Sequence, residues 1–301
     1  MRIASPVPTS PALPHDWPRA TLERSGAFQL AIREANTQQP GPPMVLVHGL
    51  GSSSLLFARA WGTLAERHRL LALDLPGCGE TRGPKHRMEL GFHVEHVLRL
   101  LDRRGIERAH WVGHSMGAHI SLWAALHHPE RVAALSLISP AGIEPFDRVQ
   151  RRLLIDTFHP RAIAAARPHQ LRSHLEQGFH RMPPEAEWLH HRRVSLQGGR
   201  LERYAHAFSR GVRAMLDAPV HHRLTEIEHP TLLAIGAQDA LVPNRFFRPA
   251  DSPAALVARA QAAMPRADAR VVDGAGHLLP FERPADFVHL VSAMHSATAE
   301  R

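Results

Sequence analysis

Short apolar runs alternate along the chain with longer segments in which apolar residues recur every three or four positions. The short runs predict strands at residues 28–34, 44–48, 70–74, 110–115, 133–138, 231–236 and 269–274, and the run at 44–48 is typical of a buried strand. The longer segments predict helices at residues 54–66, 89–104, 116–128, 253–263 and from about 284 onward. Strands that alternate with helices are typical of a mostly parallel sheet with helices on both faces, so we predict an α/β fold.

This alternation stops between about residues 142 and 222. The stretch has no buried-strand pattern, and its helical segments are rich in Arg, His and Glu and are separated by prolines. We therefore predict an α/β core formed by residues 26–141 and 223–301, with a helical lid inserted at residues 142–222. Residues 1–25 contain several prolines and predict an extended N-terminal arm.

The composition is that of a globular protein. The chain has 301 residues, of which 44% are hydrophobic, so it is long enough to bury a substantial core. It contains no run of about 18 apolar residues and no apolar core typical of a signal peptide near its start. We therefore expect no membrane span and a cytoplasmic location.

The net charge of +8 raises the question of a nucleic-acid partner. The basic residues, nearly all arginine, are spread over the whole chain with acidic residues between them. A nucleic-acid-binding protein usually gathers its basic residues in a stripe and carries a recognisable motif. We therefore expect no nucleic-acid partner.

The 24 histidines and the single cysteine, Cys78, raise the question of a metal site. His93 and His96 could share one face of a helix, but no pattern of the H-E-x-x-H type accompanies them. We expect the histidines to be exposed and to bind no metal. Cys78 cannot form an intrachain disulfide, and its place in a glycine-rich turn indicates a small buried or half-buried side chain.

Ser115 stands in the sequence GHSMG, between Gly113 and Gly117, where a predicted strand ends and a helix begins. This G-x-S-x-G pattern is typical of a nucleophile elbow, a sharp turn that presents a serine hydroxyl above a sheet. Bulkier neighbours would collide with the adjoining strand and helix. The pattern also fits a serine that merely caps the helix.

A serine needs a base and a group that orients the base before it can attack a carbonyl. Asp239 follows the strand at 231–236, and His277 follows the strand at 269–274. The carboxyl ends of parallel strands meet at one edge of a sheet, so Ser115, Asp239 and His277 are predicted to form a catalytic triad. An acid placed after an earlier strand remains an alternative, in which Asp239 would be a turn residue; Glu144 and Asp147 are the acidic residues near that place, but they lie further along the chain. Separately, His277 could be an ordinary loop residue.

Two backbone N–H groups are candidates for an oxyanion hole. Met116 begins the helix after Ser115, and Leu50 lies in the sequence VHGLGSSS after the strand at 44–48. Two such donors would stabilise the anion that forms when Ser115 attacks a carbonyl.

Five motifs in order carry a family resemblance: HGLG, DLPGCGET, GHSMG, GAQDALVP and GAGHLLPFERP. With them the sequence resembles the α/β-hydrolase superfamily, in the branch with a lid, from about residue 28 to 296. The resemblance implies a serine hydrolase that needs no cofactor and no metal. Ser115 stands where dehalogenases and epoxide hydrolases of the superfamily carry aspartate, and His114 stands where C–C bond hydrolases usually carry asparagine.

We therefore predict a serine hydrolase that cleaves a carboxylic ester of a small or medium apolar acyl compound. The partner is a small-molecule substrate, and Phe146, Trp188 and Phe208 of the insert are candidates for its binding pocket. One alternative is a C–C bond hydrolase with the same triad, and another is a non-catalytic small-ligand receptor of the same fold. The oligomeric state is left open.

Overall fold

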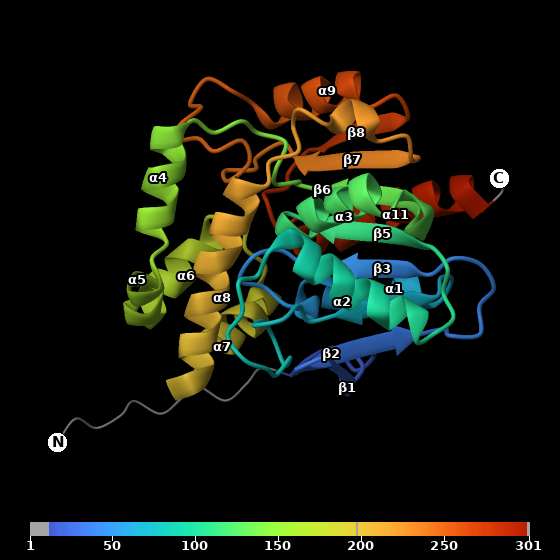
Figure 1. The fold of residues 1–301 in the computed structure, drawn as a ribbon, viewed down its shortest axis with the longest axis horizontal. Coiled ribbons are helices and arrows are strands. Elements are labelled where there is room, and N and C mark those ends of the chain that lie inside the picture. The colour runs from blue at the N-terminus through green and yellow to red at the C-terminus, as the bar shows by residue number, and fades with distance from the viewer. Residues whose placement is uncertain (1–11, 197, 300–301) are drawn as a thin grey trace.

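A computed structural model describes residues 12–196 and 198–299 of the chain. An eight-stranded sheet forms its centre, in the order β1-β2-β4-β3-β5-β6-β7-β8 (Figure 1). The strands are β1 (Thr21–Ser25), β2 (Phe28–Ala35), β3 (Met44–Val47), β4 (Leu70–Leu73), β5 (Ala109–His114), β6 (Val132–Ile138), β7 (Thr231–Gly236) and β8 (Ala267–Val272). Strand β2 is antiparallel to both its neighbours, β1 and β4, whereas the strands from β4 to β8 in this order are parallel. The predicted α/β architecture is confirmed.

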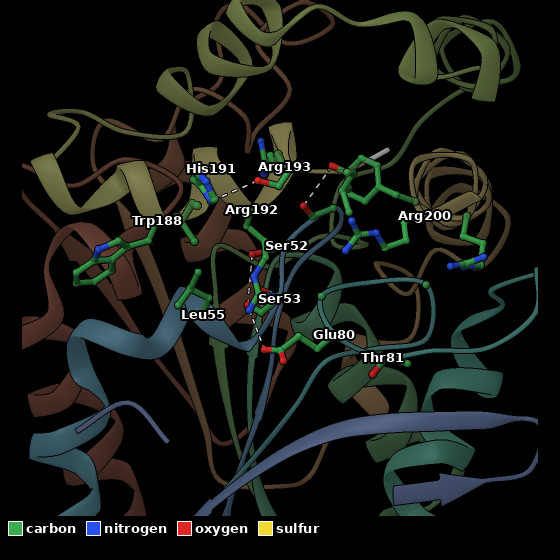
Figure 2. Close-up of a pocket in the computed structure, with 18 of the residues that line it drawn as sticks. Ser52, Ser53, Leu55, Glu80, Thr81, Trp188, His191, Arg192, Arg193 and Arg200 are labelled. Carbon is green, nitrogen blue, oxygen red and sulfur yellow. Dashed lines mark hydrogen bonds and ion pairs between the residues drawn. The ribbon is translucent and has the colours of Figure 1, made fainter. Parts of the chain in front are cut away.

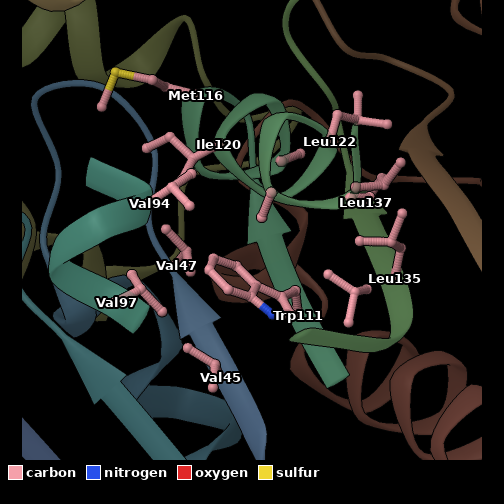
Figure 3. Close-up of a cluster of buried hydrophobic side chains, with 14 of the residues drawn as sticks. Val45, Val47, Val94, Val97, Trp111, Met116, Ile120, Leu122, Leu135 and Leu137 are labelled. Carbon is pink, nitrogen blue, oxygen red and sulfur yellow. The ribbon is translucent and has the colours of Figure 1, made fainter. Parts of the chain in front are cut away.

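Helices cover both faces of the sheet because successive side chains of each strand point to opposite faces. The core helices are α1 (Ala58–Ala65), α2 (Leu90–Asp102), α3 (Met116–His127), α9 (Pro253–Ala263), α10 (Leu279–Glu282) and α11 (Pro284–Ala299). In β3, Val45 and Val47 pack with α2 and α3, whereas Met44 and Leu46 pack with α1 and α11. Figure 3 shows Trp111 of β5 at the centre of the first cluster, between β3 and β6.

Five helices lie between β6 and β7, in the segment predicted as an insert. They are α4 (Arg148–Thr157), α5 (Pro160–Ala165), α6 (Pro168–Glu176), α7 (Glu187–Val194) and α8 (Gly198–Asp217). Figure 1 shows them gathered beyond the ends toward which the parallel strands point. Short 3-10 helices complete the described elements at Ser54–Phe57, Pro129–Arg131, Pro184–Ala186 and Leu224–Glu226.

The N-terminal segment contains a strand that the sequence analysis placed in an extended arm. Residues Thr21–Ser25 form β1 and pair along their whole length with β2. The ring of Trp17 packs edge-on against Trp61, with ring centres 5.3 Å apart, so this segment is anchored to the core as well. Residues 1–11 of the predicted arm lie outside the described residues.

The prediction of exposed histidines is wrong for several residues, since His68, His110, His114 and His119 are buried. It is also wrong for His93 and His96. Both lie on the inner side of α2, with 2% of each residue exposed. Burial, with smaller contributions from nearby positive groups, lowers the pKa of His93 to about 3 and that of His96 to about 4, so both rings are neutral. In the described part of the chain, no group of three or more His, Cys, Asp or Glu residues is arranged to bind a metal ion.

Two other expectations concern Cys78 and membrane-spanning helices. Cys78 is buried, as its glycine-rich surroundings predict. None of the helices in residues 12–196 and 198–299 combines the length and the apolar character that a membrane crossing requires.

Candidate active site

Ser115 stands on a strained turn between β5 and α3. Its φ of 52° and ψ of −115° are unusual for a residue with a side chain and hold the serine in a sharp reversal of the chain. The surrounding backbone maintains this conformation. The N–H of Ser115 donates to the carbonyl oxygen of Ile138 at 2.9 Å, and its carbonyl oxygen accepts from Ala141 at 3.2 Å.

The two flanking glycines permit this turn because the chain leaves no room for a Cβ. A Cβ on Gly113 would lie 2.4 Å from the carbonyl oxygen of Gly117. A Cβ on Gly117 would lie 2.0 Å from the carbonyl oxygen of Val47. Both contacts involve backbone atoms that cannot swing away, so the G-x-S-x-G spacing is a steric requirement of the elbow.

Asp239 and His277 lie together after the ends of β7 and β8. The Nδ1–H of His277 donates to Asp239 Oδ2 at 2.9 Å, while Asp239 Oδ1 accepts the N–H groups of Leu241 and Val242 at 2.8 and 2.9 Å. Burial alone would raise the pKa of Asp239. The attraction of His277 and the three hydrogen bonds outweigh this effect and hold the pKa below its usual value. The carboxylate is therefore ionised and fixes the orientation of the imidazole.

Ser115 and His277 line the same cavity of about 280 Å³. Its other walls are mostly apolar and come from both the core and the insert. Among the described residues no hydrogen bond joins Ser115 Oγ to His277, and unliganded sites commonly hold such pairs further apart than hydrogen-bonding distance. Phe146 and Phe208 line this cavity, as expected for a substrate pocket, whereas Trp188 does not.

The two predicted oxyanion donors lie beside Ser115. Met116 is the first residue of α3, so its N–H has no acceptor within the helix. Leu50 lines the cavity, and the adjoining Gly49 approaches the serine so closely that an added Cβ would be 3.0 Å from the Cβ of Ser115.

Residues 42–284 match the family of the α/β hydrolase fold. The chain belongs to this α/β-hydrolase family. It is 33% identical over 245 residues to the dihydrolipoyllysine-residue acetyltransferase component of the acetoin-cleaving system of Pseudomonas putida, a match that covers 80% of this chain but 60% of that protein. It is 30% identical over 217 residues to RutD of Azorhizobium caulinodans, for which carbamate hydrolysis is proposed; the match covers 68% of this chain and 76% of RutD.

A solved structure shows the same fold. A thermophilic esterase from Thermogutta terrifontis superposes with a TM-score of 0.76 and 19% identity, covering 93% of this chain and 98% of the esterase. At this level of identity the similarity concerns the fold. The α/β-hydrolase fold therefore rests on both sequence and structure.

In this α/β hydrolase, helix α8 of the insert packs directly on the loop that carries Leu50. A Cβ on Gly211 would lie 2.5 Å from the Leu50 side chain, and a Cβ on Gly51 would lie 2.6 Å from the ring of Phe208. The hydroxyl of Tyr204 donates to the carbonyl oxygen of Gly51 at 3.3 Å. Tyr204, Phe208 and Gly211 follow one another at helical spacing, so one face of α8 covers the loop.

His114 is hydrogen-bonded to the backbone of His277. Its Nε2–H donates to the carbonyl oxygen of His277 at 2.8 Å, and the two ring centres are 4.8 Å apart. Burial, with a smaller effect from His277, lowers the pKa of His114 to about 3, so the ring is neutral. The sequence pattern marked His114 only as a departure from the C–C hydrolases, because its contact spans 163 residues and leaves no local signal.

Glu144 and Glu282 are two further acidic residues of the site. Glu144 lines the cavity with Ser115 and accepts the N–H of Asn244 at 2.8 Å. Glu282 accepts the N–H groups of Gly276 and His180 at 2.8 and 3.1 Å. Glu282 thereby joins the loop before His277 to the insert, a role that the motif GAGHLLPFERP alone does not reveal.

A second cavity of about 810 Å³ adjoins the first, with which it shares four lining residues: Ser52, Leu175, Arg193 and Leu278. Figure 2 shows Trp188, His191 and Arg193 of α7 on one side of this cavity and Ser52, Leu55 and Glu80 of the core on the other. Trp188, predicted to contact substrate, lines this second cavity and packs edge-on against Phe281, with ring centres 5.9 Å apart.

Proposed function

We propose that the protein is a serine hydrolase that cleaves a carboxylic ester of a small or medium apolar acyl compound. The observation that carries this proposal is the shared cavity. Ser115 stands in it on a strained turn, opposite His277, whose other ring nitrogen is bound to the buried carboxylate of Asp239. A structural serine would need neither this turn nor an oriented imidazole.

The reaction proceeds in two halves. His277 Nε2 accepts the proton of Ser115 as Oγ attacks the ester carbonyl, and the N–H groups of Leu50 and Met116 hold the resulting oxyanion. The tetrahedral intermediate collapses, His277 returns the proton to the departing alkoxide, and an acyl-enzyme remains. Water that loses its proton to His277 then attacks the acyl carbonyl, and His277 returns that proton to Ser115 Oγ as the carboxylic acid departs. Asp239 stabilises the imidazolium in both halves.

The size and the walls of the first cavity support a short acyl group. About 280 Å³ lies just below the usual range for small-molecule sites. Phe158, Phe208 and Val212 of the insert and Leu241 and Val242 of the core contribute apolar side chains to it. Residues 142–222 act as a lid in this proposal because they supply one wall of the cavity over Ser115.

Two alternatives use the same site differently. A C–C bond hydrolase would use the same triad on a diketone, and a small-ligand receptor would use the cavity without chemistry. The strained Ser115 and the ionised Asp239 support catalysis over mere binding, because a receptor requires neither. The similarity to RutD adds a carbamate to the substrates that a test must include.

The test combines covalent labelling with a substrate panel. A fluorophosphonate probe should label the wild-type protein and fail to label Ser115→Ala, with both proteins folded by circular dichroism. The panel contains 4-nitrophenyl esters from acetate to decanoate, an aryl carbamate and a vinylogous diketone. We expect short esters to react fastest. Absence of labelling in folded protein would favour the receptor, and faster cleavage of the diketone or the carbamate would replace the ester proposal.

A further inference from the structure

The second cavity is lined by five arginines, Arg82, Arg192, Arg193, Arg200 and Arg203, against one acidic residue, Glu80. The carboxylate of Glu80 is already engaged, because it accepts from Arg192 at 2.8 Å and from the buried Arg33 at 2.5 Å. In the part of the chain that the structure describes, the side chains of the other four arginines form no hydrogen bond and no ion pair. The cavity therefore presents an excess of unpaired guanidinium groups.

Arg193 connects this charge to the catalytic cavity. Among the residues that the structure describes, it is the one arginine that lines both cavities, and Ser52, two residues after Leu50, lines both as well. Burial and then the positive charge of Arg193 lower the pKa of His174, whose side chain lines the catalytic cavity. A ligand bound at Ser115 could therefore extend past Arg193 into the arginine-lined cavity.

The two cavities differ in both size and chemistry. The catalytic cavity measures about 280 Å³ and is mostly apolar, whereas the adjoining cavity measures about 810 Å³ and is basic. An ester places its acyl group and its leaving group on opposite sides of the attacked carbonyl. The apolar cavity suits the acyl group, so the larger basic cavity remains for the leaving group.

We propose that the natural substrate carries an anionic leaving group, with a phosphate or a carboxylate held by Arg193 and Arg203 in the second cavity. This inference rests on the proposed ester hydrolysis and names the part of the substrate that the ester proposal leaves undefined. Guanidinium groups bind phosphate and carboxylate oxygens through paired, charge-assisted hydrogen bonds. The acyl-transfer chemistry is unchanged: the leaving alkoxide takes its proton from His277 and departs with its anionic group.

The experiment compares matched butyrate esters of phenols that carry a phosphate, a carboxylate or a neutral methoxy group at the para position. The quantity measured is the ratio of kcat/KM for each anionic ester to that for the neutral one. A fourth ester has a carboxylate at the far end of the acyl chain and methoxyphenol as leaving group. It places the negative charge on the acyl side of the ester carbonyl instead of on the leaving group. We expect a ratio on the order of tenfold for at least one anionic leaving group, lower at high salt, and no gain for the charged acyl chain. The phosphate and carboxylate arms identify which anion the cavity takes.

The variant Arg193→Gln/Arg203→Gln should reduce this ratio at least about fivefold. Arg213→Gln is the matched control because Arg213 also lies on α8, is exposed and lines neither cavity. It should retain the wild-type ratio. A ratio near one in the wild type, or an equal loss in Arg213→Gln, would overturn the proposal and attribute any preference to the overall positive charge.

Failure of ester hydrolysis would be a separate result. If no ester is cleaved, isothermal titration of the wild type and the same variants with phenyl phosphate and with benzoate decides the cavity's role. Binding that disappears in Arg193→Gln/Arg203→Gln but persists in Arg213→Gln supports the anion site without the esterase. No binding to the wild type overturns it.

Discussion

Replacement of Glu144 by glutamine should make the protein more stable at neutral and alkaline pH. The side chain of Glu144 is 6% exposed, accepts one backbone N–H from Asn244 at 2.8 Å and lies 3.8 Å from the Arg248 guanidinium. Burial raises its pKa to about 7, with smaller contributions from the negative charges of Asp239 and Asp251. The hydrogen bond and Arg248 act in the opposite direction and do not compensate.

The magnitude follows from the linkage between protonation and folding. The folded state holds the proton of Glu144 more tightly than the unfolded chain, whose pKa is near the ordinary value of 4.5. The resulting stabilisation is fully present below pH 4.5 and is lost as the pH rises through about 7. A difference of roughly 2.5 pKa units corresponds to about 3 kcal/mol of unfolding free energy. Glutamine keeps the acceptor oxygen for Asn244 and has no charge to bury, so the variant escapes this loss.

The assay is urea unfolding of the wild type and Glu144→Gln at half-unit steps from pH 5 to 8.5. The difference in unfolding free energy between the two proteins removes the pH dependence of all other groups. We expect this difference to grow in favour of Glu144→Gln by about 2–3 kcal/mol across the range, most steeply between the two pKa values of 4.5 and about 7, and to level off above pH 7. Glu130→Gln, at an exposed position, is the control. A difference that stays constant with pH would show that the buried carboxyl is not protonated near neutrality, and the reasoning would fail.

Three further predictions concern the elbow, the acid and the lid. Gly117→Ala should destabilise the protein by at least about 3 kcal/mol in urea unfolding, because its Cβ would meet the carbonyl oxygen of Val47. Gly91→Ala is the control: the nearest atom to its Cβ would be 3.4 Å away, so this variant should unfold at nearly the wild-type urea concentration. Equal stability of the two variants would contradict the steric argument. Asp239→Asn should lower kcat for a short ester on the order of 10⁴-fold with the fold intact; near-normal turnover would mean that another residue is the acid. Phe208→Ala should shift the preference among 4-nitrophenyl esters toward longer acyl chains by about 1–3 kcal/mol in relative kcat/KM, and a profile identical to the wild type would show that the ring only supports the loop beneath it.

The sequence predicted best what depends on short stretches of chain. Most strands of the sheet are apolar runs bounded by turns, and Ser115, Asp239 and His277 each follow a predicted strand, so their shared edge could be inferred from the order of elements alone. Strand β1 was missed because TLERS is polar and lies at the sheet edge, where pairing with β2 rather than an apolar pattern defines it.

Features that depend on distant contacts were not predictable in this way. The burial of His93 depends on what packs against α2, and histidine in an amphipathic helix resembles a surface residue. The environment of Glu144 forms only when Asn244, 100 residues later, donates to it. The arginine-lined cavity combines α7 and α8 with two core loops, and scattered arginines in the sequence give no sign of this convergence.

If the protein is the ester hydrolase proposed above, the contact of α8 with the loop after β3 would link entry of substrate to the ability to react. Phe208 and Gly211 press on Gly51 and Leu50, so the helix that walls the cavity also fixes the backbone beneath it. A displacement of α8 wide enough to admit a ligand would release that backbone, and Leu50 would lose its fixed position. The open protein would then be inactive, and the loop that carries Leu50 would be held in position for the reaction only after α8 closes. Turnover could not exceed the rate at which α8 closes. Water that enters the open form would meet Ser115 while the Leu50 backbone is not held in position.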